Sequence, residues 1–456
     1  MSQNTQSPQN AAPPAAHLIA RRQRTADALR ERARQVVGER GALPVVLLGA
    51  GEPISVPGQH DRVYPFMAHS DYYYLTEQQC PGGVLAIDLA EGQGSPWLAF
   101  APEVTQAHRT WEGDVTWEGA PLAELSPWLV QRRGRPVAML GCAVGAYGGG
   151  TDHKLGSELA DALLHARRVL DDVEITNMRA ACAATTAGHA YAHRMLTSGE
   201  AAGMTERQLQ VEIEAEFFRN GGDGTPYDTI VGSGPHAAVL HFAPGGRVIS
   251  KGECVLIDAG AAHKRYAGDV TRTWPVGSPT QTQRDIINIV IESEEAGIAM
   301  CKPGVEWHDV HRTCSEKVLE GLIGLGALSG DPADLVERGV AGLFFPHGVG
   351  HMIGLGVRGA GGRLPGRPPR QGPGGVGVRV DIPLEAGHGF TVEPGLYFIP
   401  GLIDVPDTRE KFKDAVRWDA IDTIRKEIQG VRIEDDIVIR DDGCEVLTAG
   451  IVKRLD

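Results

Sequence analysis

At 456 residues, with 42% hydrophobic and 22% charged residues, the chain has the length and composition of a globular protein of about two or three domains. The net charge of −14, from 44 Lys+Arg against 58 Asp+Glu, argues against general nucleic-acid binding, which depends on excess basic charge. No apolar run approaches the roughly 18 residues that cross a bilayer, so we expect no membrane association. Seven scattered cysteines predict free thiols in a reducing compartment, and hence a cytoplasmic protein.

The first 17 residues are polar and contain proline, which predicts a disordered tail in place of a signal peptide. The period of the apolar residues then predicts a helix over 21–37. Short apolar runs predict strands at 44–51, 83–89, 97–102 and 135–141. Residues 18–150 are therefore expected to form a small α/β domain. Four glycines in GAYGGGTDHK (145–154) mark its end, and residues 151–173 are expected to form a linker helix.

Residues 174–456 begin with a long helical stretch and continue into a second helix. Thr205 is the predicted N-cap of that second helix, and Gln208 completes a capping box. A further helix is expected at 307–325. Strands are expected in two pairs, at 253–260 with 265–276 and at 389–398 with 430–439. The region thus reads as a helix–strand–strand pattern written twice.

Each predicted strand of these two pairs carries an acidic residue among apolar neighbours. They are Asp258, Asp269, Glu393 and Glu434. A single carboxylate in such a place is usually paired in a salt bridge, because an unpaired buried charge is costly. Four of them, two in each half of an apparent repeat, favour a site for two divalent cations. Four carboxylates and one imidazole, from the histidines of PHGVGH (346–351), suit Mn, Co or Fe(II) at least as well as Zn.

These residues also carry a family resemblance. IDAG with Asp258, GDVTRTWPV with Asp269, PHGVGH with His351, TVEPGLYF with Glu393 and GVRIEDDIV with Glu434 resemble the dinuclear-metal peptidases of the pita-bread fold. Those are methionine aminopeptidase, Xaa-Pro aminopeptidase and prolidase, and the small N-terminal domain is similar to that of the proline-specific branch. The resemblance implies an α/β (α+β) chain with a small N-terminal α/β domain and a C-terminal pita-bread domain of two helix–strand–strand repeats. It also implies two divalent metal ions, Mn first and Co, Zn or Fe as alternatives, held by those five residues.

Further roles follow from the resemblance. Glu393 would be the proton shuttle for a metal-bridging hydroxide, and His347 would face the same cavity. His241 would steady the scissile carbonyl, and Arg379 would clamp the C-terminal carboxylate of a dipeptide. The alternative for both histidines is a structural hydrogen bond.

Three more residues resemble partners of the metal-binding carboxylates. Tyr227 and Thr271 would orient carboxylates, and Arg432 would offset negative charge, with ordinary packing as the alternative. Trp111 resembles a tryptophan that reaches the active site of a second subunit in prolidase dimers, or else it is an exposed loop residue or part of the core of its own domain. A homodimer is therefore expected.

One residue departs from the family pattern. Relatives follow the metal histidine with a run similar to GxxVHDVGG, whereas this chain has GLGVRGAGG. Arg358 stands in the place of the second histidine, and an arginine cannot act as a general acid near neutral pH. Either Arg358 adds to or replaces Arg379 in holding the substrate carboxylate, or the loop has drifted, the arginine faces solvent and activity is lower.

The first functional hypothesis is metal-dependent hydrolysis of Xaa-Pro dipeptides, as in prolidase. The alternative is an Xaa-Pro aminopeptidase that acts on longer peptides. A non-hydrolytic binding protein of the same fold is a third hypothesis, which retention of all five metal ligands disfavours. Phosphotriester hydrolysis by the same centre is neither supported nor excluded by the sequence.

Overall fold

A computed structural model describes residues 15–38, 41–59, 61–91, 97–364, 366–368 and 370–455. The chain forms two compact units, Met1–Arg167 and Arg168–Asp456. The division between them falls inside the predicted linker helix, and the predicted domain boundaries at 150 and 174 stay a prediction. Most of the predicted tail, residues 1–14, lies outside the described residues.

The first unit is built on one mixed five-stranded sheet in the order β4-β3-β2-β1-β5. Its strands are β1 (Val45–Gly49), β2 (Val84–Asp88), β3 (Leu98–Ala101), β4 (Ala120–Pro121) and β5 (Val137–Gly141). Four of these confirm the predicted strands, because each is a short apolar run that packs in the core of the unit. β1 pairs antiparallel with β2 and parallel with β5.

Helices complete the first unit. They are α1 (Ala16–Val37), α2 (Ser70–Thr76), α3 (Gln106–Trp111), α4 (Leu125–Val130) and α5 (His153–Arg167). α1 begins five residues before the predicted Arg21, because Leu18 adds one more buried apolar position to the helical face. α5 lies inside residues 151–173, where the linker helix is predicted, and it packs on α1 and β5 within the first unit. Trp111 ends α3 with 85% of its surface exposed and does not pack within its own unit.

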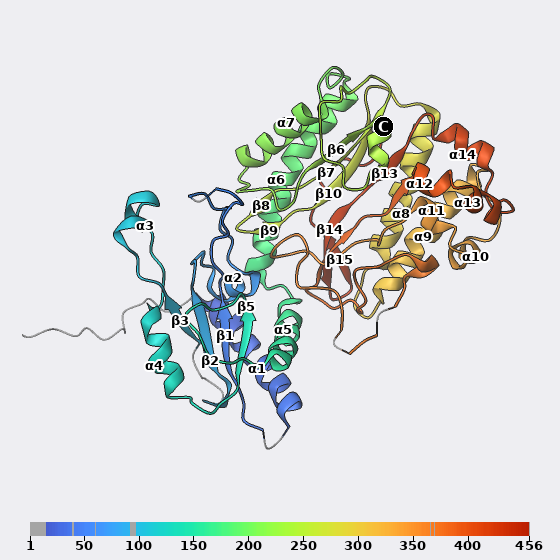
Figure 1. Cartoon of the computed structure of the whole chain (residues 1–456). Coiled ribbons are helices and arrows are strands. Elements are labelled where there is room, and N and C mark those ends of the chain that lie inside the picture. Colours follow the sequence, from blue (N-terminus) through green and yellow to red (C-terminus); the bar gives the residue numbers. More distant parts are fainter. Residues whose placement is uncertain are drawn as a thin grey trace, which may run out of the picture. The chain divides into compact units, whose positions relative to one another are not determined.

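In the second unit, two pairs of helices flank the strands that carry the predicted acids (Figure 1). α6 (Asp172–Thr197) and α7 (Glu206–Arg219) pack together, and so do α8 (Gln281–Met300) and α9 (Trp307–Gly324). The strands are β6 (Ile230–Ser233), β7 (Cys254–Ala259), β8 (Ala262–His263), β9 (Tyr266–Ala267), β10 (Val270–Pro275), β11 (Gly389–Val392), β12 (Gly395–Tyr397), β13 (Gly430–Arg432), β14 (Asp435–Arg440) and β15 (Gly443–Val446). Each half contains one antiparallel three-stranded sheet, β10-β7-β6 in the first half and β11-β14-β15 in the second. Each half also contains one shorter pair of strands, β8-β9 in the first and β12-β13 in the second. Short helices fill the remainder: α10 (Pro332–Glu337), α11 (Ala341–Phe344), α12 (Pro400–Ile403), α13 (Pro406–Lys411) and α14 (Trp418–Ile424).

The helix α8 was absent from the sequence prediction. Its signal is present, because Thr280 and Gln283 form the same capping box that marks α7. The four apolar positions Ile286, Ile287, Val290 and Ile291 lie fully buried in the core that α8 shares with α9. The repeated pattern is therefore helix–helix–strands in each half.

Three predicted strands are divided in the structure at the acid they carry. Asp269 lies between β9 and β10, Glu393 between β11 and β12, and Glu434 between β13 and β14. Pro394 ends β11 because proline has no N–H for the ladder. The amides of the other two acids bond outside their own strand, Asp269 N to Asp436 Oδ2 (2.8 Å) and Glu434 N to the Thr271 carbonyl (3.0 Å). Each break therefore interrupts the regular alternation of side chains along the strand at the position of the carboxylate.

The predicted capping box of α7 is confirmed, with Gln208 N donating to Thr205 Oγ1 over 3.1 Å and Thr205 N donating to Gln208 Oε1 over 2.8 Å. We expect Thr205→Ala to lower the free energy of unfolding by about 1 kcal/mol, because it leaves an N-terminal amide of α7 without its acceptor. Urea unfolding followed by circular dichroism measures this difference. Thr176→Ala, at an exposed position inside α6, is the matched control and should change stability by less than about 0.5 kcal/mol.

Candidate metal and substrate site

The second unit contains a cavity of about 580 Å³ that gathers nearly all the predicted site residues. Those that line it are Tyr227, His241, Asp258, Asp269, His347, His351, Arg358, Arg379, Glu393, Arg432 and Glu434. Thr271 is the one predicted residue outside the lining, and it lies directly behind Glu434. Residues that are up to about two hundred positions apart in the sequence therefore line the same cavity.

Three donor groups at the base of the cavity have the arrangement of a metal site. One donor atom each from Asp269, His351 and Glu434 lies within 4.8 Å of the other two. His351 Nε2 is 3.3 Å from Asp269 Oδ2 and 3.8 Å from Glu393 Oε1. All three residues are at most 5% exposed, so water compensates little of their charge. Oxygen donors with one imidazole suit hard or borderline divalent cations.

The side chain of Asp258 extends this cluster. Its Oδ2 accepts a hydrogen bond from Arg432 Nη2 over 2.6 Å. Its Oδ1 is buried and has no hydrogen-bond partner among the described residues. A buried carboxylate oxygen without a donor is costly unless a cation binds it, so Asp258 also fits a metal site.

The ring of His351 is oriented by the backbone. Its Nδ1 lies 3.0 Å from the Met352 carbonyl, which places the proton on Nδ1 and leaves the Nε2 lone pair toward the acids. The amide of His351 donates to Thr391 Oγ1 over 3.2 Å, and Thr391 N donates back to the His351 carbonyl over 2.9 Å. Thr391 is thus a supporting residue that the sequence reasoning missed.

A chain of hydrogen bonds runs behind the carboxylates. Thr271 Oγ1 donates to Glu434 Oε2 over 2.6 Å and accepts from Arg432 Nε over 3.0 Å. Arg432 Nη1 donates to the Tyr397 hydroxyl over 2.9 Å, and that hydroxyl lies 2.9 Å from His347 Nε2. Tyr397 was also missed, although it lies in the quoted TVEPGLYF run. These hydrogen bonds hold Glu434 and Asp258 in place through the single guanidinium of Arg432.

His347 lines the cavity with both ring nitrogens engaged. Its Nδ1 lies 2.9 Å from the Gly348 carbonyl, and Nε2 faces the Tyr397 hydroxyl. Burial, followed by the charge of Arg432, lowers the pKa of His347 to about 3, so its ring is neutral near pH 7. The neutral ring accepts the Tyr397 hydroxyl proton in a hydrogen bond.

Burial dominates the proton affinities of the acids. It raises the pKa of Glu393 to about 7, with His351 and Arg432 acting in the opposite direction. Burial also raises the pKa of Glu434, and the charges of Asp269 and Glu393 raise it further. The Tyr227 hydroxyl is buried against Asp258 and Asp269, and its pKa is raised in turn. The pKa values of these groups are raised because the site lacks positive charge. A divalent cation would supply that charge and would stabilise the site.

The remaining predicted residues lie at the exposed side of the cavity. His241, Arg358 and Arg379 are exposed, and burial together with the charges of Arg432 and Arg379 lowers the pKa of His241. Neither Arg358 nor Arg379 forms an ion pair with any described residue. Two guanidinium groups that have no anionic partner within the described part of the chain thus line the same cavity as the carboxylate cluster.

An ion-pair cluster anchors the loop that carries Arg379. Arg367 bonds to Glu306 Oε2 (3.0 Å) and Asp381 Oδ1 (2.9 Å), and Arg370 bonds to the same two acids. Glu306 is the N-cap residue of α9, so the loop is tied to a rigid helix. Because Asp381 lies two residues from Arg379, this cluster sets where the Arg379 backbone meets the cavity.

Comparison with known proteins identifies the family to which this chain belongs. The model of metallopeptidase family M24 matches residues 176–441, which is more than half of the chain. The chain belongs to metallopeptidase family M24. Peptidases of this family use divalent metal ions, and the cluster around His351 is the candidate site in this M24 chain.

Its relatives include both classes of proline-specific peptidase. The chain is 39% identical to the Xaa-Pro aminopeptidase of Escherichia coli over 253 residues, which cover 55% of this chain and 50% of that protein. It is 30% identical to Xaa-Pro aminopeptidase 1 of Streptomyces coelicolor, over 89% of this chain and 82% of that protein. It is 36% identical to the human Xaa-Pro dipeptidase, over 56% of this chain and 53% of that protein.

Solved structures agree over almost the whole chain. The structure of Pseudomonas aeruginosa aminopeptidase PepP matches with a TM-score of 0.71 at 26% identity, covering 94% of this chain and 96% of that one. Zn-substituted Escherichia coli aminopeptidase P, in complex with product, matches with a TM-score of 0.69 at 27% identity and the same coverage. The expected fold, a small N-terminal domain followed by a pita-bread domain, is confirmed. Among the described residues, no helix has both the length and the apolar character to cross a bilayer.

Proposed function

We propose that this M24 chain hydrolyses the bond that precedes proline in Xaa-Pro dipeptides, with two divalent metal ions of which Mn²⁺ is the first candidate. The observation that carries the proposal is a single cavity with two neighbouring features. It holds a buried cluster of carboxylates with one imidazole, and beside this cluster are two arginines that lack an anionic partner among the described residues. The first feature suits divalent cations, and the second suits the carboxylate of a short peptide.

The metal ligands in this proposal are Asp258, Asp269, His351, Glu393 and Glu434. The donor set and the unpartnered Asp258 Oδ1 support it. When bound, the metal ions supply Lewis-acid activation of a water molecule.

The side chains around the metal site handle the proton and the substrate. Glu393 accepts a proton from the attacking water and returns it to the proline nitrogen. His241 donates a hydrogen bond to the carbonyl oxygen of the scissile bond. Thr271 and Arg432 hold the carboxylates in place, and His347 holds Arg432 indirectly through Tyr397. The buried Tyr227 hydroxyl lies near Asp258 and Asp269 and would orient them once metal is bound.

The two arginines distinguish this proposal from a general peptidase. We expect Arg379→Ala and Arg358→Ala each to raise the KM for Xaa-Pro dipeptides by at least about tenfold, because each removes a charge-assisted bond to the substrate carboxylate. Steady-state kinetics on Ala-Pro measures this effect, with Arg417→Ala as the control at an exposed site away from the cavity. Arg358→His, which restores the residue type of relatives, tests the departure directly. An unchanged KM in both Arg358 variants would show that Arg358 does not bind the substrate carboxylate.

A second candidate is an Xaa-Pro aminopeptidase that removes the first residue from longer peptides. The similarity to Streptomyces coelicolor Xaa-Pro aminopeptidase 1 over 89% of the chain, and to aminopeptidase P structures, favours it. In that case the arginines would meet the peptide beyond proline, and an extended substrate would bind at least as well as a dipeptide.

One assay separates the two candidates. Metal-free protein is given Mn²⁺, Co²⁺ or Zn²⁺ and offered Ala-Pro, Ala-Pro-Ala and Ala-Ala. The proposal expects cleavage of Ala-Pro and little or no cleavage of the other two peptides. Efficient cleavage of Ala-Pro-Ala supports the aminopeptidase instead.

A further inference from the structure

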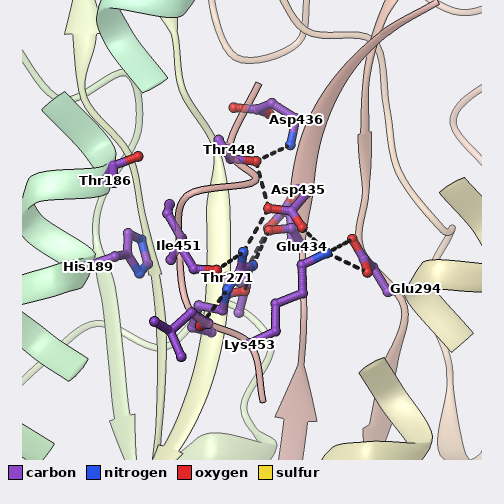
Figure 2. A network of polar contacts seen from close by, with 12 residues as sticks. Thr186, His189, Thr271, Glu294, Glu434, Asp435, Asp436, Thr448, Ile451 and Lys453 are labelled. Atoms are coloured by element: carbon purple, nitrogen blue, oxygen red, sulfur yellow. Dashed lines mark hydrogen bonds and ion pairs between the residues drawn. The ribbon is translucent and has the colours of Figure 1, made fainter. Parts of the chain in front are cut away.

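The segment after β15 runs back along the strands of the site. This strap, residues 448–453, lies against Asp435 and Asp436, which directly follow Glu434 (Figure 2). Thr448 Oγ1 donates to Asp435 Oδ1 over 2.6 Å and accepts from Asp436 N over 3.1 Å. Asp435, Asp436 and Thr448 are fully buried. The strap therefore contacts the two residues next to a proposed metal ligand, and none of these contacts lies in the lining of the cavity.

Arg272 joins the strap to both halves of the site. Its guanidinium is fully buried and donates to Asp435 Oδ1 (2.7 Å) and to the carbonyl of Glu434 (2.7 Å). The same side chain donates to the carbonyls of Ile451 and Val452, each over 3.2 Å. Because Arg272 belongs to β10, one side chain ties the strap to β10 and to the start of β14.

Lys453 ends the strap inside the same network. Its Nζ donates to Glu294 Oε1 (2.9 Å) and Oε2 (2.8 Å) and forms an ion pair with Asp435 Oδ2. Glu294 lies on α8 and is fully buried, and the Lys453 side chain is 18% exposed. The strap thus supplies one ammonium group that pairs with Glu294 and, together with Arg272, with Asp435.

The network continues into the proposed metal site at two points. Asp436 Oδ2 accepts from the amide of Asp269 over 2.8 Å, while the amide of Asp436 is held by Thr448. Glu434 is held through its own carbonyl by Arg272. Displacement of the strap would therefore release the backbone on which both Asp269 and Glu434 are mounted.

We propose that the strap positions Asp269 and Glu434 for metal binding, with Lys453 as the residue that fastens it. This inference rests on the proposed function, because it takes those two acids as metal ligands. Lys453 does not line the cavity, so it acts through the backbone and not by contact with metal or substrate. Partners behind the ligands of a metal typically change its affinity by 10–100-fold.

The test measures the affinity of metal-free protein for Mn²⁺ by titration calorimetry. We expect Lys453→Met to weaken binding by at least about tenfold, and Lys453→Arg to recover most of it. Arg454→Met is the matched control, because Arg454 is the next residue and pairs with the neighbouring Glu295, but both are about half exposed. It should leave Mn²⁺ affinity unchanged.

A second variant covers the case in which Lys453→Met does not fold. Glu294→Gln combined with Lys453→Met removes both charges of the pair, leaves Asp435 bonded to Arg272 and Thr448, and should fold while still losing affinity. If either folded variant binds Mn²⁺ as tightly as the parent, the strap proposal is wrong and the proposed function stands. If the parent itself binds no Mn²⁺, both fail together.

Discussion

Replacing Glu434 by glutamine is expected to weaken Mn²⁺ binding by more than about 100-fold and to reduce hydrolysis to background. Loss of a partner behind a ligand already costs 10–100-fold, and the ligand itself should cost more. The shape of the side chain is kept, and the amide oxygen can still accept the hydrogen bond from Thr271 Oγ1. The loss should therefore report the missing charge and not a rearranged site.

The same substitution has an opposite expected effect on the metal-free protein. Burial and the neighbouring acids raise the pKa of Glu434, which means that its ionised form is disfavoured when no cation is present. Removing that group should leave the metal-free protein at least as stable as the parent. Chemical unfolding with and without Mn²⁺ measures both effects, and Glu410→Gln, at a strongly exposed position, is the control. Retained Mn²⁺ affinity in Glu434→Gln would exclude Glu434 as a ligand.

Arg432→Met is expected to destabilise the metal-free protein by about 3–5 kcal/mol, because it leaves a buried charge without its partner. Arg432 is 3% exposed and donates to Asp258, Thr271 and Tyr397. Without it, both oxygens of Asp258 lack a donor among the described residues. Added Mn²⁺ should recover part of the lost stability, since a cation replaces the missing charge.

The control for this effect is an exposed pair of the same type. Arg338 bonds to Asp414 over 2.8 Å, with side chains 42% and 63% exposed, so Arg338→Met should cost less than about 1 kcal/mol. Both are measured by urea unfolding of the metal-free protein. A loss below about 1 kcal/mol for Arg432→Met would mean that the acids of the cavity are compensated in another way.

The acids of the site were predictable because a buried carboxylate is stable only with a cation or a strong hydrogen-bond donor beside it. Asp258 and Glu434 lie in apolar runs, and a charge in that setting must find a cation or a strong donor. The capping box at Thr205 was equally accessible, since it depends on residues three positions apart. The exposed arginines were harder, because the loop before Asp381 has no regular period and its position depends on ion pairs with the distant Glu306.

Thr271 and Arg432 were predicted as supporting residues, but two others could not be found from the sequence. Tyr397 and Thr391 are ordinary strand residues, and their roles appear only when β11 and β12 meet the segment around His351. The division of the strands at Asp269 and Glu434 has the same origin, because the amides there bond across the two halves of the repeat. Lys453 carries no local signal, since its partner Glu294 is 159 residues away.

The central claim is that the cluster around His351 binds divalent metal and that the loaded protein cleaves the bond before proline. The most direct measurement is the hydrolysis of Ala-Pro by metal-free protein during titration with Mn²⁺, alongside the bound metal determined by mass spectrometry. We expect activity to rise with bound Mn²⁺ and to saturate at two ions per chain, with Ala-Ala untouched. Metal-free protein that cleaves Ala-Pro at full rate, or metal-loaded protein that cleaves neither Xaa-Pro dipeptides nor longer Xaa-Pro peptides, would contradict the account.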